Sequence, residues 1–253
     1  YSTPMIQAIT FDFWDTLVKD ESDEPKRAAM GLPSKPAARL QLLVEEITRH
    51  HPAITPAQVS DAFQQANRLF NHYWKVEHHT PPVAQRLQVV YDYLNLTRTP
   101  GFTAVVRQFE EMEVDIPPDY VPGAAETLAT LAGHYKLGLI SDTIHTPGRG
   151  IRRLLAEAGL LDCFQCFIFS DEVGASKPNP IVFEKAAAGL GVPLSQIVHV
   201  GDRESNDVAG PLAVGMKAIL FTGAVDRGRD GTQATAVCRD FTALPAIIGV
   251  LNS

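Results

Sequence analysis

The sequence predicts an α/β protein in which a Rossmann-like parallel sheet forms the core and an all-helical cap domain is inserted into it. After about residue 122, short β-prone runs alternate with helical segments, as they do in parallel sheets with crossover helices. Between about residues 35 and 115 the apolar residues recur at helical spacing throughout. A chain of 253 residues has room for a core of ordinary domain size and such an insertion.

The strands of the core are expected where short apolar runs precede polar clusters. The first strand is expected at 6–11 and leads directly into Asp12, and the others at 136–140, 166–170, 196–200 and 217–221. Helices are expected near 123–132, 147–158, 180–189 and 206–214, with a late apolar run at 234–238 and a closing helix near 243–251. No helix directly after the first strand returns to the sheet. We therefore predict a core of residues 1–21 and 118–253 and a cap of residues 22–117.

Four amphipathic helices with short joints are expected in the cap. Their apolar residues recur at i, i+3, i+4 and i+7, as in Leu40, Leu43, Val44 and Ile47. One helix begins at the capping box Thr55-Pro56-Ala57-Gln58, with proline at the first helical position. The aromatic side chains near the end of this helix could line a substrate pocket, but their helical spacing favours core packing: Phe70, Tyr73 and Trp74.

Composition and charge exclude several classes of protein. The formal charge of −7 argues against a general nucleic-acid binder, which normally carries a basic stripe. No apolar run reaches the roughly 18 residues of a membrane span, and no secretory signal is visible at the start. Three cysteines fit a reducing compartment, so a cytoplasmic protein is expected. Cys163-x-x-Cys166 could be half a zinc site or a redox pair, but its apolar surroundings favour buried structural cysteines.

Four polar clusters follow predicted strands. In an open parallel sheet, ligands bind at the carboxyl ends of the strands, so these clusters are expected to converge on one edge. Three of their carboxylates form a hard-oxygen set suited to Mg²⁺: Asp12, Asp202 and Asp207. The clusters are Asp12-Phe13-Trp14-Asp15-Thr16-Leu17, Ser141-Asp142-Thr143, Lys177-Pro178-Asn179-Pro180 and Gly201-Asp202-Arg203-Glu204-Ser205-Asn206-Asp207.

These motifs, in this order and with a helical insertion after the first, resemble those of the haloacid dehalogenase superfamily of hydrolases from Ile6 to about Phe221. The resemblance implies that Asp12 is the nucleophile that forms an aspartyl-phosphate, and that Lys177 pairs with it and with the phosphate. It further implies that the phosphate is bound by Ser141, Asp142 and Lys177. The implied cofactor is Mg²⁺, and its ligands are the carboxylates of Asp12, Asp202 and Asp207 and the backbone carbonyl of Trp14.

Trp14 departs from the family pattern. Phosphatases of this family carry a second Asp at that position, which protonates the leaving alkoxide and then activates water. Trp cannot exchange a proton in this pH range, and Asp15, one residue later, is expected to face the other side. A general acid or base of this kind typically increases the reaction rate by about 10²–10⁴-fold. His145 is the best-placed substitute acid; the cap histidines are interpreted as helix-end or solvated residues: His50, His51, His72, His78 and His79.

Several functions are compatible with Trp14. The retained Asp202 and Asp207 favour a Mg²⁺-dependent phosphatase that acts on a small phosphate ester. An aromatic residue at this position also resembles the dehalogenase branch, in which halide needs no protonation but no metal is required. Phosphonate-cleaving members use a cap lysine that forms an imine, and a catalytically degenerate member would serve binding or regulation. The available cap lysines are Lys26, Lys35 and Lys75.

The remaining polar residues of interest receive minor roles, and some properties are not predicted. Arg203 and Glu204 are expected only to tune the loop between the two acids of the last motif. The run from Asp226 to Gly231 is expected to be a solvated, turn-rich loop. The sequence predicts neither the substrate nor the oligomeric state.

Overall fold

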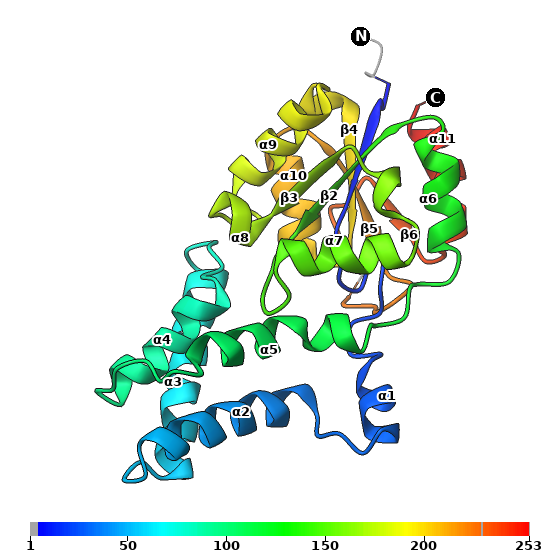
Figure 1. Ribbon diagram of the computed structural model, residues 1–253. Helices are drawn as coiled ribbons and strands as arrows, with labels where there is room; N and C mark the ends of the chain where they lie inside the picture. The colour runs from blue at the N-terminus through cyan, green and yellow to red at the C-terminus, as the bar shows by residue number, and fades with distance from the viewer. Residues whose placement is uncertain (1–4, 229, 253) are drawn as a thin grey trace.

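A computed structural model describes residues 5–228 and 230–252 of the chain. Its core is a six-stranded parallel sheet with the strand order β3-β2-β1-β4-β5-β6, which confirms the predicted α/β class (Figure 1). The ends of the predicted core, residues 1–4 and 253, and residue 229 of the predicted solvated loop lie outside the described residues. The strands are β1 (Ala8–Phe11), β2 (Lys136–Ser141), β3 (Cys166–Phe169), β4 (Ile197–Gly201), β5 (Lys217–Phe221) and β6 (Ala236–Cys238).

β1 lies at the centre of the sheet, with β2 on one side and β4 on the other. All four of its residues are buried, as expected for a strand of a parallel sheet covered on both faces. Phe11 is in register with Leu139 of β2 and Val200 of β4. The carboxyl ends of these three strands are therefore adjacent, and the polar residues that follow them meet at one edge of the sheet.

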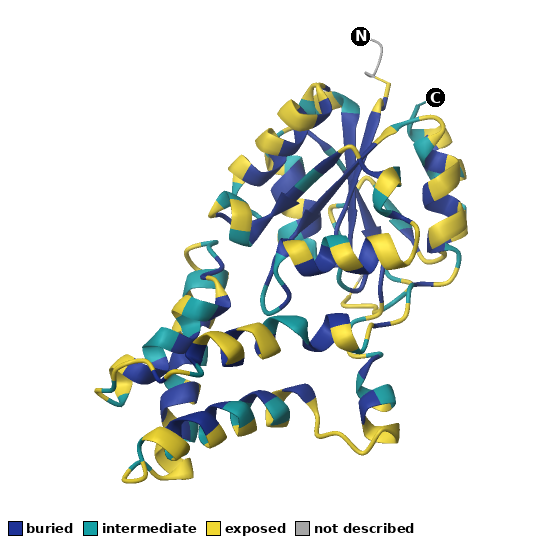
Figure 2. Cartoon of the chain, viewed as in Figure 1, coloured by how far each residue is buried: buried dark blue, intermediate teal, exposed yellow. Residues whose placement is uncertain are grey.

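Helices cover both faces of the sheet, and the strands appear as a buried layer between them (Figure 2). Ile9 and Phe11 face a large apolar cluster that includes residues of α6 (Ala124–Ala132), α7 (Gly148–Glu157) and α11 (Leu244–Leu251). Ala8 faces a second cluster with residues of α9 (Pro180–Leu190). The short helices α8 (Ser170–Val173) and α10 (Gly210–Ala213) complete the core.

The helix predicted near 206–214 has a different form. Residues Glu204–Ala209 form a π-helical segment, and α10 follows it directly. Such segments are rare and frequently occur at functional sites. This one carries Asp207, and its wider turn decides where that carboxylate lies.

Between β1 and α6 the chain forms five helices, which lie below the sheet in Figure 1. The four expected amphipathic helices are present, whereas the short helix α1 was not predicted. Helices α2 to α5 bury an apolar cluster of their own that includes Leu43, Phe63, Tyr91 and Phe109. The predicted capping box forms at Thr55 and Gln58. The five helices are α1 (Glu24–Ala29), α2 (Lys35–His50), α3 (Pro56–Lys75), α4 (Val83–Tyr93) and α5 (Phe102–Asp115).

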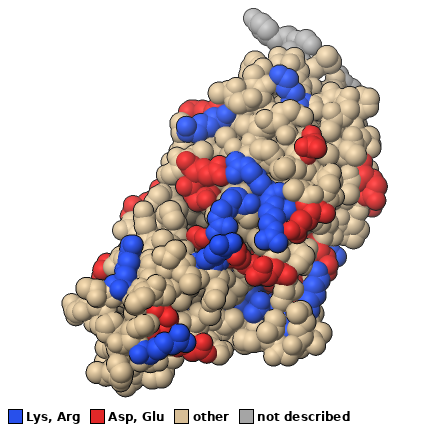
Figure 3. All heavy atoms as spheres, viewed as in Figure 1, with Lys and Arg blue, Asp and Glu red and all other residues tan. Residues whose placement is uncertain are grey.

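Ion pairs join the inserted helices to the core. Arg149 of α7 pairs with Glu110 of α5 at 2.5 Å and with Glu111 at 3.3 Å. Lys26 of α1 pairs with Asp119 at 2.7 Å. Figure 3 shows basic side chains gathered across the middle of one face, with acidic side chains on either side of them. Exposed pairs of this kind each contribute only about 0–1 kcal/mol, so they mainly set the orientation of the helices.

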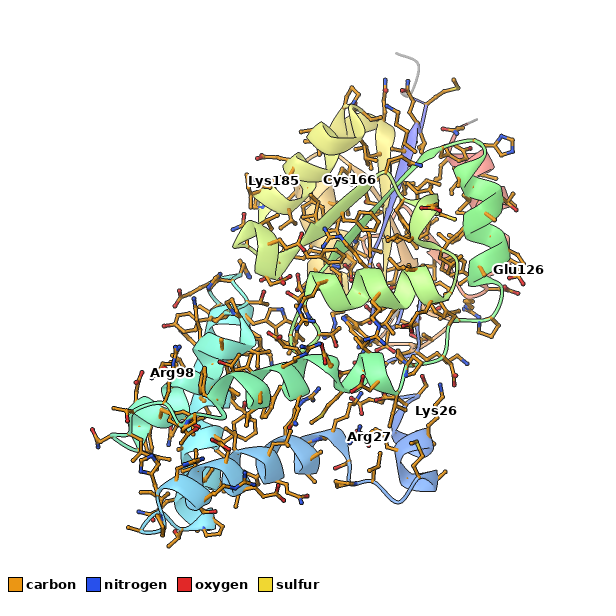
Figure 4. The ribbon with its side chains drawn as sticks, in the orientation of Figure 1. Lys26, Arg27, Arg98, Glu126, Cys166 and Lys185 are labelled. Carbon is orange, nitrogen blue, oxygen red and sulfur yellow. The ribbon has the colours of Figure 1, made fainter. Side chains whose placement is uncertain are left out.

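The burial of the cysteines largely agrees with the prediction that they are buried structural residues. All three are free thiols; Cys166 and Cys238 are buried, and Cys163 is half-buried. Cys166 lies on the edge strand β3 (Figure 4) and packs in the apolar cluster shared with α9, where its Sγ would lie 2.6 Å from a Cβ added to Gly189. Within residues 5–228 and 230–252, one group of side chains is close enough to share a metal ion, and no cysteine belongs to it. Across the same residues, no helix is both long and apolar enough to cross a membrane.

Candidate active site

Three carboxylates meet at the carboxyl edge of the sheet. Asp12 follows β1, Asp202 follows β4, and Asp207 lies in the π-helical segment; all three are buried. One oxygen of each lies within 4.8 Å of the others. Asp12 continues the ladder, because its N–H donates to the carbonyl of Val200 at 2.9 Å. A side chain at Gly201 would overlap the carboxylate of Asp207, so glycine is required for this approach.

Lys177 lies between two of these carboxylates. Its Nζ donates to Asp207 Oδ1 at 2.6 Å and forms an ion pair with Asp12 Oδ1 at 2.8 Å. The side chain is only 2 % exposed. Burial alone would lower the pKa of the Lys177 ammonium, but Asp12 and Asp207 outweigh burial and raise it. Lys177 is therefore a fixed positive charge between two carboxylates.

Asp12 and Asp207 differ in how strongly they hold a charge. Burial raises the pKa of Asp12 to about 7; Lys177 opposes the rise and Asp207 adds to it. Burial also acts to raise the pKa of Asp207, but Lys177 and His199 outweigh it and hold that pKa below its ordinary value. Asp207 is thus the firmly ionised member, and a further positive charge near Asp12 would favour its ionised form as well.

His199 is a buried member of this network that the sequence analysis did not single out. Its Nε2 lies 3.1 Å from Asp207 Oδ1, and its Nδ1 lies 2.9 Å from the hydroxyl of Thr10. Since a carboxylate only accepts, Nε2 carries the proton and Nδ1 accepts from Thr10. The only signal in the sequence was a histidine inside the apolar run Ile197-Val198-His199-Val200.

The acidic cluster fits a hard divalent cation. Asp202 Oδ1 is buried and has no hydrogen-bond partner, so a ligand for this oxygen is missing. Asp207, in contrast, accepts hydrogen bonds at both oxygens, the second from the N–H of Arg203 at 3.0 Å. A donor set made only of oxygen atoms suits Mg²⁺ rather than a softer metal. The residues present could therefore hold Mg²⁺, with Asp202 offering the least engaged carboxylate oxygen.

A pocket of about 260 Å³ opens beside the cluster. The sheet edge contributes Asp12, Trp14 and Lys177 to its lining. The inserted helices contribute Lys35 and Arg39 of α2, Trp74 of α3 and Glu113 of α5. Asp142 also lines the pocket, whereas Ser141 is buried at the end of β2. The pocket is thus enclosed between the sheet edge and the inserted helices.

Comparison with known proteins agrees with this geometry. Residues 6–215 match the family model described as haloacid dehalogenase-like hydrolase. The chain belongs to this hydrolase family. It is 30% identical over 219 residues to the glyceraldehyde 3-phosphate phosphatase of Pyrococcus abyssi, an alignment that covers 86% of this chain and 82% of that protein.

Solved structures show the same fold. A phosphatase of this family from Thermococcus onnurineus superposes with a TM-score of 0.65 and 24% sequence identity, covering 96% of this hydrolase and 98% of that chain. A 2-haloacid dehalogenase from Pseudomonas syringae superposes with a TM-score of 0.67 and 20% identity, covering 98% of this hydrolase and 100% of that chain. The fold is therefore shared by members with two different chemistries.

Trp74 of this hydrolase belongs to the site, which corrects the prediction that it packs in the core of the cap. Its indole Nε1 donates to Asp142 Oδ2 at 2.9 Å, and the guanidinium of Arg203 lies 5.7 Å from its ring centroid. Asp142 also accepts from the backbone N–H of Lys177 at 3.0 Å and from Asn206 at 3.3 Å. The Asp142 carboxylate therefore links α3 to the sheet edge, and Arg203 does more than tune its loop.

Arg227 corrects a second prediction, because the loop that was expected to be solvated reaches the acidic cluster. Its guanidinium donates to Asp202 Oδ2 and, at 2.7 Å, to Asp15 Oδ2. Asp15 is buried and adopts a left-handed backbone with φ of 53°. The side chain of Asp15 is thus turned to Arg227, as expected for a residue that faces away from Trp14.

His145 lines the pocket but is unsuited to the role of substitute acid. Its Nε2 lies 3.2 Å from Arg86 Nη1, and because arginine only donates, this nitrogen carries no proton. Burial and the charges of Arg39 and Arg86 lower the pKa of His145 well below its usual range. The ring is therefore neutral. The cap histidines lie at or beyond helix ends, as predicted: His50, His51, His72, His78 and His79.

Proposed function

We propose that this hydrolase is a Mg²⁺-dependent phosphatase that cleaves a small phosphate ester through an aspartyl-phosphate on Asp12. The observation that carries the proposal is the buried cluster of Asp12, Asp202 and Asp207, with the Lys177 ammonium between two of its members. The similarity to a glyceraldehyde 3-phosphate phosphatase supports a small phosphorylated substrate. The helices of residues 22–117 would then act as the cap that closes over it.

Asp12 would act as the nucleophile. One of its oxygens attacks phosphorus, the bond from phosphorus to the leaving oxygen breaks, and the leaving oxygen takes up a proton. Water then attacks the aspartyl-phosphate and releases inorganic phosphate, so that one difficult displacement becomes two easier ones. Lys177 keeps its charge throughout, because Asp12 and Asp207 hold its proton, and it therefore faces the charge that develops on the transferred phosphoryl group.

Mg²⁺ would be held by the carboxylates of Asp12, Asp202 and Asp207 and the backbone carbonyl of Trp14. When bound, it would supply the positive charge that lets an anionic nucleophile meet a phosphate dianion. The Oδ1 of Asp202 supports this assignment, because it is buried without a partner even though Arg227 holds the other oxygen of the same carboxylate. Asp207 would also fix Lys177 and the π-helical segment, since both of its oxygens accept hydrogen bonds from the protein.

The pocket between the sheet edge and the inserted helices would set the size of the substrate. A volume of about 260 Å³ suits a small ester better than a macromolecule. The buried ion pair of Arg39 with Glu113 at 2.6 Å gives the far wall a fixed, polar surface. Closure of this wall over the substrate would exclude water other than the reacting molecule.

The alternative chemistries have weaker support. A dehalogenase needs no metal, so the buried Oδ1 of Asp202 would have no binding partner in such an enzyme. A phosphonate-cleaving enzyme needs a neutral lysine, but Asp23 and Glu113 raise the pKa of Lys35 in spite of its burial, and its Nζ donates to Asp23 at 2.8 Å. Lys26 lies on α1 and pairs with Asp119 (Figure 4). Neither Lys26 nor Lys35 is therefore prepared to form an imine, and Lys75, the third candidate, does not line the pocket beside the acidic cluster.

The test is release of phosphate from glyceraldehyde 3-phosphate and from 4-nitrophenyl phosphate, with Mg²⁺ and with a chelator. We expect turnover only with Mg²⁺, and none in the Asp12→Asn variant. Asp61→Asn, an exposed acid of α3, is the matched control and should keep full activity. Metal-independent release of chloride from 2-chloropropionate would replace the proposal with a dehalogenase. Turnover of neither class of substrate would indicate a binding protein.

A further inference from the structure

Trp14 leaves the proposed phosphatase without the carboxyl group that usually protonates the leaving oxygen. A replacement must lie in the pocket, hold a proton in the free enzyme and be able to release it. Within the described residues, six carboxyl groups line the pocket, and each can be examined for these properties: Asp12, Asp20, Glu21, Glu113, Asp142 and Asp207.

Three of the six are held as anions or already have a role. Asp12 is the proposed nucleophile, and Asp207 is bonded to Lys177 at 2.6 Å. Glu113 accepts from Arg39 at 2.6 Å and from Thr146 at 2.9 Å. Asp12 is committed to the bond with phosphorus, and the hydrogen bonds to Asp207 and Glu113 favour their ionised forms, so none of the three can deliver a proton to a leaving group.

Two more are unsuitable in geometry. The Asp142 carboxylate accepts hydrogen bonds from the N–H of Lys177, from Trp74 and from Asn206, so both of its oxygens are engaged by the protein. The side chain of Glu21 is 67% exposed, which leaves its carboxylate in contact with water rather than enclosed with the substrate.

Asp20 is the remaining carboxyl group of the six, and it meets the geometric requirements. The segment that leads from β1 into α1 (Figure 1) carries Asp20, which lies eight residues after Asp12 and lines the pocket, as Trp14 does. Its carboxylate accepts a hydrogen bond from the N–H of Glu21 at 2.9 Å, and in the described part of the chain it makes no ion pair. Burial raises the pKa of the Asp20 carboxyl; Lys35 opposes the rise and Asp15 adds to it.

The main chain at Asp20 is held in place from the core. Its own N–H donates to Asp15 Oδ1 at 3.0 Å, and the other oxygen of Asp15 accepts from Arg227 at 2.7 Å. The preceding N–H, of Lys19, donates to the carbonyl of Asp119 at 2.8 Å. A carboxyl group fixed in this way can be aimed at a substrate atom, which a general acid requires.

We infer that Asp20 is the general acid and base of this enzyme, in place of the residue that Trp14 has displaced; the inference rests on the proposed phosphatase function. In the first step Asp20 gives its proton to the leaving oxygen as the phosphorus–oxygen bond breaks, and an alcohol departs. In the second step the Asp20 carboxylate takes a proton from water as the resulting hydroxide attacks the aspartyl-phosphate. The bond from phosphorus to Asp12 breaks, and Asp20 is protonated again.

Leaving groups of different acidity test this role. In Asp20→Asn, kcat/KM for glycerol 3-phosphate should fall by about 10²–10⁴-fold, because its alkoxide cannot depart without a proton. With 4-nitrophenyl phosphate, kcat/KM should be unchanged, since nitrophenolate departs as an anion. The second step still lacks its base, so nitrophenolate should appear as a rapid burst of one equivalent per enzyme followed by slow turnover.

Asp61→Asn, which removes an exposed acid of α3 outside the pocket, is the control, and we expect both substrates to be turned over as in the wild type. Equal losses with both substrates in Asp20→Asn would overturn the inference, because a structural role does not depend on the leaving group. If Glu21→Gln, rather than Asp20→Asn, lost activity with glycerol 3-phosphate but not with 4-nitrophenyl phosphate, the general acid would be Glu21, and the inference for Asp20 would also be overturned. If wild-type protein turned over neither ester with Mg²⁺, the proposed function itself would have failed, and this outcome is distinct from the others.

Discussion

Replacement of Lys177 by methionine removes the single ammonium between Asp12 and Asp207 while keeping most of the volume of the side chain. In the wild type, its Nζ lies 2.8 Å from one carboxylate and 2.6 Å from the other, and it is 2 % exposed. Without it, three carboxylates whose oxygens lie within 4.8 Å of one another would remain, and one of them, Asp202, would still pair with Arg227. We expect a large loss of stability that depends on Mg²⁺.

The magnitude follows from the charges. Two carboxylates 4.8 Å apart repel each other by about 3 kcal/mol at an effective dielectric constant of about 20. Removing one partner of a buried ion pair generally costs about 3–5 kcal/mol, which agrees with this figure. For a chain of this size, such a loss corresponds to a fall in Tm of about 10 °C. Burial raises the pKa of Asp12 to about 7 in the wild type, where Lys177 opposes the rise; without Lys177 this pKa rises further, so protonation of Asp12 relieves the repulsion unless the pH is alkaline.

Thermal unfolding followed by circular dichroism tests this reasoning. With a chelator at alkaline pH, where Asp12 is ionised, the Tm of Lys177→Met should lie about 10 °C below that of the wild type. Mg²⁺ should restore more of the Tm in the variant than in the wild type, because the cation replaces the lost charge. Lys185→Met, which removes an exposed lysine of α9 (Figure 4), is the control and should change little. A Lys177→Met protein as stable as the wild type without Mg²⁺ would refute the argument.

Three further substitutions test the inserted helices and their attachment. Glu113→Gln should lower stability by about 3 kcal/mol at neutral pH. Burial disfavours the ionised form of Glu113, but the charges of Arg39 and Lys35 and the hydrogen bonds from Arg39 and Thr146 together outweigh burial and lower its pKa below 4.5, so this stabilisation is lost as the pH falls through the lowered pKa. Trp74→Phe removes the hydrogen bond to Asp142 and should cost about 1.5–3 kcal/mol in urea unfolding. Phe109→Ala should cost about 3–5 kcal/mol and increase hydrogen exchange in α2 to α5 more than in β1.

Each of these expectations has a contrary outcome. A stability difference between Glu113→Gln and wild type that stays constant down to strongly acidic pH would contradict the assigned ion pair. Trp74→Phe with unchanged unfolding would show that the contact with Asp142 does not fasten α3. Equal acceleration of exchange in β1 after Phe109→Ala would mean that the inserted helices and the sheet unfold as one unit.

The sequence predicted those parts of the site that depend on local order along the chain. Asp12 and Asp202 directly follow strands whose apolar runs are easily recognised, and the strands of a parallel sheet end at a common edge. The strand at 217–221 was placed with its observed bounds, and the others differ by one or two residues. These are properties of short segments, and periodicity and turn residues describe them well.

The parts that were missed depend on how distant surfaces meet. The spacing of Trp74 shows that it lies on the apolar side of α3, but not that this end of the helix contacts Asp142. Arg227 lies in a loop of charged and glycine residues, and such a composition is equally typical of a solvated turn. The π-helical segment at Asp207 replaces part of a predicted helix, since apolar periodicity does not record which carbonyl each N–H reaches.

The strand order has a consequence for the time at which this site can exist. β1 leads directly into Asp12, the proposed nucleophile, and is completed by residue 11, yet it is flanked by β4, which ends at residue 201. The chain must therefore be made almost to its end before β1 gains its second neighbour and Asp12 gains Asp202 and Asp207. During synthesis the inserted helices can pack against one another first, because their contacts are closer in sequence. The acidic cluster is therefore assembled only in a late stage of folding.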